Sequence, residues 1–319
     1  MSTTPVGAAP RVVAVVVTWN RRELLLESLA AVRARFADVE LIPLRRNTGG
    51  AGGFAAGLDR ALASGAELVW LMDDDTVPEP GALAALVQAR GRAPGPPPAL
   101  VASRVVWTDG REHPMNTPRR KPFATRAERA AAAAAGCVPV RSASFVSVLV
   151  DAAQCRRRGL PQADYFLWND DFEYTTRLIR GGTGWLCPAS VAVHKTRTFG
   201  STDIDPGARF YYEVRNKIWM LRSGAPLGPV ERVLYGGSTL RRWARTFARS
   251  SDRAVLRSSL VRGFAAGVRT SPRRPEEVLA AAGLTVPGRA APGRAAPVPT
   301  APVPTAPVPT GPGASPPAR

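Results

Sequence analysis

The sequence predicts an α/β fold in which a mostly parallel sheet is flanked by helices. Residues 11–18 and 67–72 are apolar runs of the kind that form central, buried strands. Between them, residues 21–35 carry leucines at helical spacing. Because strand-like and helix-like stretches alternate along the chain, we expect a parallel sheet with helices on its faces.

The remaining elements can be expected in order along the chain. Asn20 can cap the first helix, and a connector rich in proline and glycine follows at residues 92–98. Strands are expected at residues 11–18, 39–44, 67–72, 100–107, 144–150 and 191–194. Helices are expected at residues 21–35, 54–64, 81–90, 130–135 and 169–180.

The composition is that of a globular protein. Of the 319 residues 45% are hydrophobic, and no apolar run approaches the roughly 20 residues that span a bilayer. Residues 1–10 lack the basic start and apolar middle of a secretory signal. Cys137, Cys155 and Cys187 are odd in number and far apart, so we expect a reducing, cytoplasmic compartment.

The net charge of +18 rests mainly on arginine. Such a charge suits nucleic acid, an anionic membrane surface or phosphorylated substrates. The aromatic residues are not interleaved with the basic ones, as a stacking platform for nucleic acid requires. Nucleic-acid binding is therefore the least favoured of the three.

The chain divides into regions by composition. We expect a disordered N-terminus at residues 1–10, an α/β domain at 11–225, a basic helical region at 226–285 and a disordered tail at 286–319. The tail repeats Ala-Pro-Val-Pro-Thr, a proline-rich pattern that cannot build a core.

The helical region contains one amphipathic signal. Trp243 and Phe247 are four residues apart and face one way among arginines. This pattern fits a helix lying on anionic lipid. It fits equally well a helical appendage that packs on the α/β domain and leaves its arginines in water.

Polar residues follow three of the expected strands, at residues 18–21, 47–53 and 73–75. In open α/β sheets, ligands bind beyond the carboxyl ends of the strands. Because the three stretches share that location, we expect them to form one site.

The acidic triplet is the strongest candidate for metal binding. In an extended chain, Asp73 and Asp75 project to the same side and Asp74 to the other. Two carboxylates at this spacing suit a divalent cation, and His194 could complete the site as a neutral imidazole. The alternatives are a solvated acidic turn before a helix and an ordinary core histidine.

The glycine run at residues 47–53 and the acids at residues 169–171 each allow two interpretations. The glycines could let backbone amides approach a diphosphate, or they could form a tight turn. The acids could cap a helix, or one of them could be a general base whose pKa is raised by the neighbouring Trp168 and Phe172.

Five motifs occur in a fixed order: residues 15–21, 47–54, 73–75, 168–174 and His194. Together they resemble glycosyltransferase family 2, which has the GT-A fold, and within it the actinobacterial galactofuranosyltransferases that build cell-wall galactan. The similarity covers roughly residues 11–222, including residues 209–216.

The resemblance implies an inverting transferase at the cytoplasmic face of the membrane, acting on a nucleotide-sugar donor and a lipid- or polymer-linked glycan acceptor. It implies that Asp171 is the base and that Trp168 and Asp170 bind the acceptor. Asp73, Asp75 and His194 would bind Mn²⁺ or Mg²⁺. The implied donor-binding residues are Thr18, Arg21, Asn47, Gly49, Gly50 and Asp74.

The chain departs from the family pattern after the first helix. Family members carry a further strand there, ending in an acidic residue that contacts the nucleotide base, whereas residues 36–40 run directly into the strand expected at 39–44. This departure motivates a second hypothesis, in which the chain is a catalytically weakened binding protein that keeps the fold.

Overall fold

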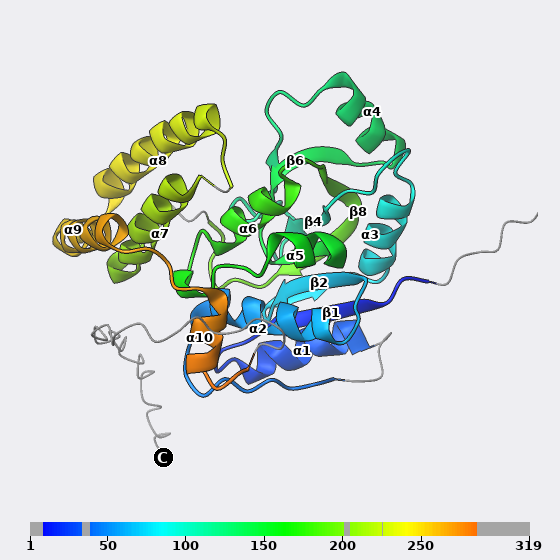
Figure 1. Ribbon diagram of the computed structural model, residues 1–319, viewed down its shortest axis with the longest axis horizontal. Coiled ribbons are helices and arrows are strands. Elements are labelled where there is room, and N and C mark those ends of the chain that lie inside the picture. The colour runs from blue at the N-terminus through cyan, green and yellow to red at the C-terminus, as the bar shows by residue number, and fades with distance from the viewer. Residues whose placement is uncertain (1–8, 34–38, 201–204, 225, 286–319) are drawn as a thin grey trace, which may run out of the picture. The chain divides into compact units, whose positions relative to one another are not determined.

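The computed structural model describes residues 9–33, 39–200, 205–224 and 226–285. Most of the expected disordered N-terminus, residues 1–8, and the proline-rich tail at 286–319 lie outside the described residues. Figure 1 shows the described chain as a sheet covered by helices, with further helices gathered beside it.

The described strands form one eight-stranded sheet, and the α/β prediction is confirmed. Seven strands follow the order β1-β2-β7-β4-β8-β6-β5, while β3 pairs with β8. Their bounds are β1 Val12–Val17, β2 Leu68–Asp73, β3 Thr76–Pro78, β4 Leu100–Val106, β5 Arg119–Arg120, β6 Val138–Ser142, β7 Ser147–Asp151 and β8 Gly184–His194.

The expectation of a mostly parallel sheet is wrong, because the sheet is mixed. Only the β1–β2 and β4–β8 pairs are parallel among the described strands; β7 runs antiparallel between β2 and β4. The short strands β3, β5 and β6 also pair antiparallel. These short strands gave no apolar run long enough to be recognised, and β8 extends well before the expected residues 191–194.

Helices cover both faces of the sheet. One core cluster joins Phe54 and Leu58 of α2 with Tyr174 of α6, and a second joins Leu86 of α3 with Trp70 of β2. The helices are α1 Arg22–Arg33, α2 Gly49–Ala63, α3 Ala82–Gly91, α4 Arg126–Ala134, α5 Ala152–Arg158, α6 Asp170–Ile179, α7 Phe210–Ser223, α8 Pro229–Arg249, α9 Arg253–Arg269 and α10 Pro275–Ala281.

Helix α2 begins at Gly49, five residues before the expected start at residue 54. Its glycines bring the helix close to β1: a Cβ at Gly53 would lie 2.5 Å from Val17 Cγ1, and one at Gly57 would lie 2.3 Å from Val15 Cγ1. The glycine run is therefore neither a tight turn nor a separate loop. It is the first half of a helix that packs closely on a strand.

The strand expected at residues 39–44 is not formed. Leu41 is 78% exposed, and the segment is held by other contacts: Arg60 Nε donates to Glu40 Oε1 at 2.8 Å, and the Arg45 N–H donates to the Ala282 carbonyl at 3.0 Å. These contacts with α2 and with the end of α10 override the β-propensity of the run. Within the described residues, β1 pairs with β2 alone.

Helices α7, α8 and α9 lie together on one side of the sheet (Figure 1). The rings of Trp243 and Phe247 on α8 both meet Phe210 of α7, with centroids 5.8 Å apart in each pair. Of the two interpretations of this aromatic pair, packing on the domain is correct. In the described part of the chain, no helix is both long and apolar enough to cross a bilayer.

Candidate functional site

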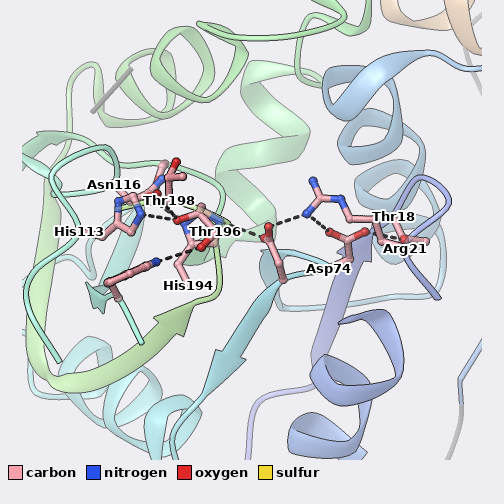
Figure 2. Close-up of polar contacts among 11 residues, drawn as sticks. Thr18, Arg21, Asp74, His113, Asn116, His194, Thr196 and Thr198 are labelled. Carbon is pink, nitrogen blue, oxygen red and sulfur yellow. Dashed lines mark hydrogen bonds and ion pairs between the residues drawn. The ribbon is translucent and has the colours of Figure 1, made fainter. Parts of the chain in front are cut away.

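The acidic triplet lies where β2 ends and the chain turns into β3. Thr18 Oγ1 donates to Asp74 Oδ2 at 2.6 Å. Arg21 Nη1 lies 3.3 Å from Asp74 Oδ1 and 2.6 Å from Asp75 Oδ2, and so bridges the two carboxylates. Figure 2 shows Thr18 and Arg21 beside Asp74, with His194 and Asn116 on the other side of the view. Asp74 thus faces the end of β1, while Asp75 lies between Arg21 and His194 and contacts both.

His194 reaches the triplet through strand pairing. Thr76 of β3 is paired with His194 at the end of β8, so the register fixes the histidine beside the acids. His194 Nε2 lies 3.0 Å from Asp75 Oδ1, although the two residues are 119 positions apart. Candidate ligand atoms of Asp73, Asp75 and His194 all lie within 4.8 Å of one another.

Asn116 fixes the orientation of the His194 ring. Its Oδ1 lies 2.8 Å from His194 Nδ1, and its Nδ2 lies 3.4 Å from Ser144 Oγ. With Nδ1–H donating to Asn116, a neutral ring turns its Nε2 lone pair toward Asp75. Two acceptors face each other there, an arrangement that suits a cation between them, and a ligand histidine held through its other nitrogen is typical of metal sites.

A second histidine lies behind the first. The His113 ring is 5.2 Å from that of His194, and its Nε2 is 2.9 Å from Thr196 Oγ1 (Figure 2). Burial, with the charge of His194, lowers the pKa of His113. Neither His113 nor Asn116 was assigned a role from the sequence; the only signal was that His113 is one of two histidines in the chain.

The carboxylates of the cluster have opposite pKa shifts. Burial raises the pKa of Asp73 to about 7, and the neighbouring carboxylates of Asp75, Asp74 and Asp171 add to the rise. Burial also opposes ionisation of Asp75, but His194, when its ring is protonated, supplies a hydrogen bond and a positive charge, and together with Arg21 it lowers the pKa of Asp75 to about 2. The charge of a protonated His194 opposes the rise at Asp73 as well, but burial prevails there, and a bound cation would favour the ionised carboxylate.

Asp170 and Asp171 begin helix α6. Burial raises the pKa of both carboxyls, and the charge of Asp171 raises that of Asp170 further. The charge of Asp171 also raises the pKa of Asp73, so the two groups act on each other across the site. The Phe172 N–H donates to Asp171 Oδ1 at 2.6 Å. A partly exposed carboxyl with a raised pKa is suited to accept a proton near neutral pH.

The residues before α6 have an unusual backbone. Phe166, Trp168 and Asn169 have φ angles of 65°, 64° and 65°, in the left-handed region that non-glycine residues rarely adopt. Asn169 stands at the N-cap position but makes no capping bond with its side chain; its Nδ2 donates to Glu213 Oε2 at 2.7 Å instead. Such backbone persists only where surrounding contacts hold it.

Helix α7 supplies those contacts. Asn216 is fully buried, and its Nδ2 lies 2.9 Å from each of the carbonyl oxygens of Tyr165, Leu167 and Trp168. Arg215 Nη2 donates to the carbonyl of Asp164 at 2.8 Å. We call residues 164–169 the strained loop. The sequence included residues 209–216 in the family resemblance but assigned them no role.

A group of charged residues from α7 and α8 completes this end of the site. Glu213 accepts hydrogen bonds from Arg242 and, at 3.1 Å, from Trp243 Nε1. Lys217 is buried beside it, and burial lowers the pKa of its ammonium to about 8 although Glu213 opposes the shift. Arg119 and Lys217 both lower the pKa of Asp171, which burial raises. None of these residues was proposed from the sequence.

The start of α2 joins the strained loop to the donor side. Asn47 Oδ1 accepts the Gly49 N–H at 2.8 Å, and the Phe166 carbonyl accepts the Ala51 N–H at 3.3 Å. A Cβ at Gly49, where φ is +68°, would lie 1.9 Å from the Phe166 oxygen. Only glycine fits there, so Gly49 allows the helix start to touch the loop.

Every residue proposed from the sequence lines one cavity of about 1370 Å³. These residues are Thr18, Arg21, Asn47, Gly49, Gly50, Asp73, Asp74, Asp75, Trp168, Asp170, Asp171 and His194. The structure therefore brings together all of the expected positions, from five separate stretches of chain. Their individual roles remain predictions.

Comparison with known proteins agrees with this geometry. Residues 25–141 match the family described as Glycosyl transferase family 2. The resemblance to glycosyltransferase family 2 is confirmed. The chain is 31% identical over 202 residues to galactofuranosyltransferase GlfT1 of Mycobacterium tuberculosis, which covers 56% of this chain and 62% of that protein.

Two further proteins either align with a shorter part of the chain or are less similar to it. GlfT1 of Mycolicibacterium smegmatis is 41% identical over 92 residues, covering 21% of this chain and 30% of that protein. The chain thus spans less than two thirds of the length of these curated relatives. Mannosyltransferase PcManGT from Pyrobaculum calidifontis, solved with GDP-Man and Mn²⁺, aligns with a TM-score of 0.46 and 14% identity, covering 82% of this chain and 88% of that one.

Proposed function

We propose that the protein is a metal-dependent, inverting glycosyltransferase. It would move a sugar from a nucleotide-sugar donor to a hydroxyl of a lipid- or polymer-linked glycan. One observation carries the proposal: the cluster of Asp73, Asp75 and His194 lines the same cavity as Asp171.

The first end of the cavity fits a divalent cation. Two carboxylates and one imidazole are a donor set that Mn²⁺ accepts, and Mg²⁺ fits the carboxylates. When bound, the cation supplies positive charge to the diphosphate of the donor as it leaves. Arg21 adjoins the same acids and would add a fixed positive charge to the donor side. Thr18, Asp74, Asn47 and the start of α2 at Gly49 and Gly50 would complete the donor contacts.

The second end of the cavity fits the acceptor. Asp171 would take the proton of the attacking hydroxyl. Burial raises the pKa of its carboxyl, which makes the carboxylate a stronger base, and the residue remains partly exposed. Asp170 and Trp168 would orient the acceptor sugar beside it. In a single displacement, the acceptor oxygen would form its bond to the anomeric carbon on the face opposite the leaving nucleoside diphosphate, whose bond to that carbon breaks. The anomeric configuration would therefore invert.

The proposed sugar is galactofuranose, donated by UDP-galactofuranose. The support is the likeness to galactofuranosyltransferases, at 31% identity over part of their length. Rhamnose or another hexose is the alternative within the same family. A donor screen decides between them: purified protein with Mn²⁺ is incubated with UDP-galactofuranose, UDP-galactose and dTDP-rhamnose, and products are followed by mass spectrometry. Turnover of none of the three would contradict the proposal.

One observation favours a second function, that of a catalytically weakened binding protein. Residues 39–44 form no strand, and β1 has no partner on its outer side within the described sheet. The part of the site that would contact the donor base is therefore reduced. Calorimetry with the same three donors and Mn²⁺ discriminates: tight binding without turnover favours the weakened form, whereas turnover favours the enzyme.

We also propose that the protein works at the cytoplasmic face of the membrane, as a peripheral protein. The acceptor proposed above is attached to lipid or polymer there, and the chain is strongly basic.

A further inference from the structure

The outer side of helix α8 is apolar and has no partner among the described residues. Val230, Val233, Leu234 and Leu240 are 71%, 76%, 55% and 65% exposed. Their spacing along the helix places them on one side. No other described helix or strand exposes as many large apolar side chains.

The inner side of α8 packs on the rest of the protein. Tyr235 packs edge-on against Phe172 of α6, with ring centroids 5.2 Å apart. Arg242 binds Glu213, and both Arg242 and Trp243 line the site cavity. One side of α8 therefore forms part of the cavity wall while the opposite side presents apolar residues to the surroundings.

The charge around this apolar side has one sign. Helices α8 and α9 contain nine arginines and a single acid, Glu231. Glu231 does not weaken the positive surface, because it is paired with Arg141 at 2.5 Å on the inner side. Arg241 and Arg249 are exposed on α8, and α9 adds an exposed Phe264.

We propose that the outer side of α8 docks on an anionic lipid bilayer. The helix would lie in the interface, with its valines and leucines among the acyl chains and its arginines at the headgroups. This surface differs from the one expected from Trp243 and Phe247, which face the protein interior. An anionic bilayer is favoured over a protein partner because an apolar strip bordered by arginines, without acids, complements lipid headgroups.

Docking through α8 would bring the cavity close to a lipid-linked acceptor. The biological role of the docking rests on the proposed function, whereas the docking itself does not. A helix is roughly 10 Å across, so the cavity wall formed by α8 would lie about that far from the lipid. An acceptor sugar attached to a membrane lipid could then enter the cavity while its anchor stays in the bilayer.

Vesicle co-sedimentation of the full chain tests the proposal without requiring activity. We expect binding to phosphatidylcholine vesicles that contain phosphatidylglycerol, weaker binding to phosphatidylcholine alone, and loss of binding as salt rises. The double variant Val233→Asp, Leu240→Asp should no longer bind. The double variant Arg241→Glu, Arg249→Glu should bind at least roughly fivefold more weakly for each arginine lost.

Matched controls are Phe123→Asp and Arg126→Glu, which alter an even more exposed apolar residue and an exposed arginine away from α8. Both should bind vesicles like the wild type. The proposal is overturned if the wild type binds neither vesicle, if the α8 variants bind as well as the controls, or if gel filtration shows that Val233→Asp, Leu240→Asp converts a dimer to a monomer. Donor turnover, measured separately on the same samples, reports on the proposed function and not on docking.

Discussion

The two ends of the cavity are held in place by different means. The end formed by Asp75 and His194 is fixed by backbone: β3 pairs with β8, and the register sets the histidine beside the acid. The end formed by Asp171 depends on side chains, since the strained loop before it is held by Asn216 and Arg215 of α7.

This difference has consequences for the effects of mutation. Strand register tolerates the loss of a single side chain, because the ladder of backbone hydrogen bonds remains. A loop with residues in the left-handed region, held largely by one buried amide, does not, because losing the Asn216 amide removes the donor to the Leu167 and Trp168 carbonyls. At the metal end, formed by Asp75 and His194, a substitution should therefore affect only the group that is changed. At the acceptor end, formed by Asp171 and the strained loop, a substitution that loosens the loop should displace all of its residues together.

The sharpest test of this comparison uses two isosteric substitutions, Asp73→Asn and Asp171→Asn. Asp73→Asn should weaken Mn²⁺ binding, and added Mn²⁺ should restore part of the transfer. Asp171→Asn should bind Mn²⁺ and donor like the wild type but transfer about 10²–10⁴-fold more slowly, because the proton acceptor is lost. Calorimetry with Mn²⁺ and initial rates give both readouts. Full activity in Asp171→Asn would show that the base lies elsewhere.

A smaller effect is expected behind the metal end. Asn116→Ala removes the group that orients His194, while every proposed ligand remains. Affinity for Mn²⁺ should fall by roughly 10–100-fold, and acceptor KM should not change. Thr117→Ala, which removes a hydrogen bond to the His113 carbonyl in the same loop, serves as the control. Unchanged Mn²⁺ affinity in Asn116→Ala would mean that His194 is not a ligand.

The sequence predicted the metal end better than the acceptor end for physical reasons. Asp73 and Asp75 follow an apolar strand, so a local pattern reveals both the strand and the acids at its exit. His194 was a candidate from its residue type alone, with an ordinary core histidine as the alternative, because its position depends on the pairing of β3 with β8 and no apolar pattern marked a strand as short as β3.

The contacts of the strained loop could not be read from any local pattern. Asn216 acts on carbonyls about fifty residues away, and its sequence neighbours show only an amphipathic helix. The missed mixed sheet has a similar cause, since a buried strand gives the same apolar run whether it pairs parallel or antiparallel. At residues 39–44 the run was strand-like, but contacts with α2 and the end of α10 decided the outcome.

On the acceptor end, Asn216→Ala tests whether the amide holds the loop. Its loss orphans buried carbonyls, so the free energy of unfolding should fall by about 1–3 kcal/mol. The efficiency kcat/KM for the acceptor should fall roughly tenfold to a hundredfold, through acceptor KM as the loop moves, with Mn²⁺ affinity unchanged. Ser223→Ala removes another α7 hydrogen bond, to the Met220 carbonyl, and should change neither. An equal loss of Mn²⁺ affinity in Asn216→Ala would show that the two ends are not separate.

The smallest expected effect is the pH dependence of stability set by Lys217. Its pKa is lowered from 10.5 to about 8 by burial, so the folded protein binds fewer protons than the unfolded chain between these values. Stability contributed by this group therefore rises from pH 8 to pH 10.5, by about 1–3 kcal/mol, because the buried charge is destabilising below pH 8. Lys217→Met should lose this rise, as measured by urea unfolding at both pH values. Parallel pH profiles for wild type and variant would mean that the charge of Glu213 offsets the effect of burial on the pKa of Lys217.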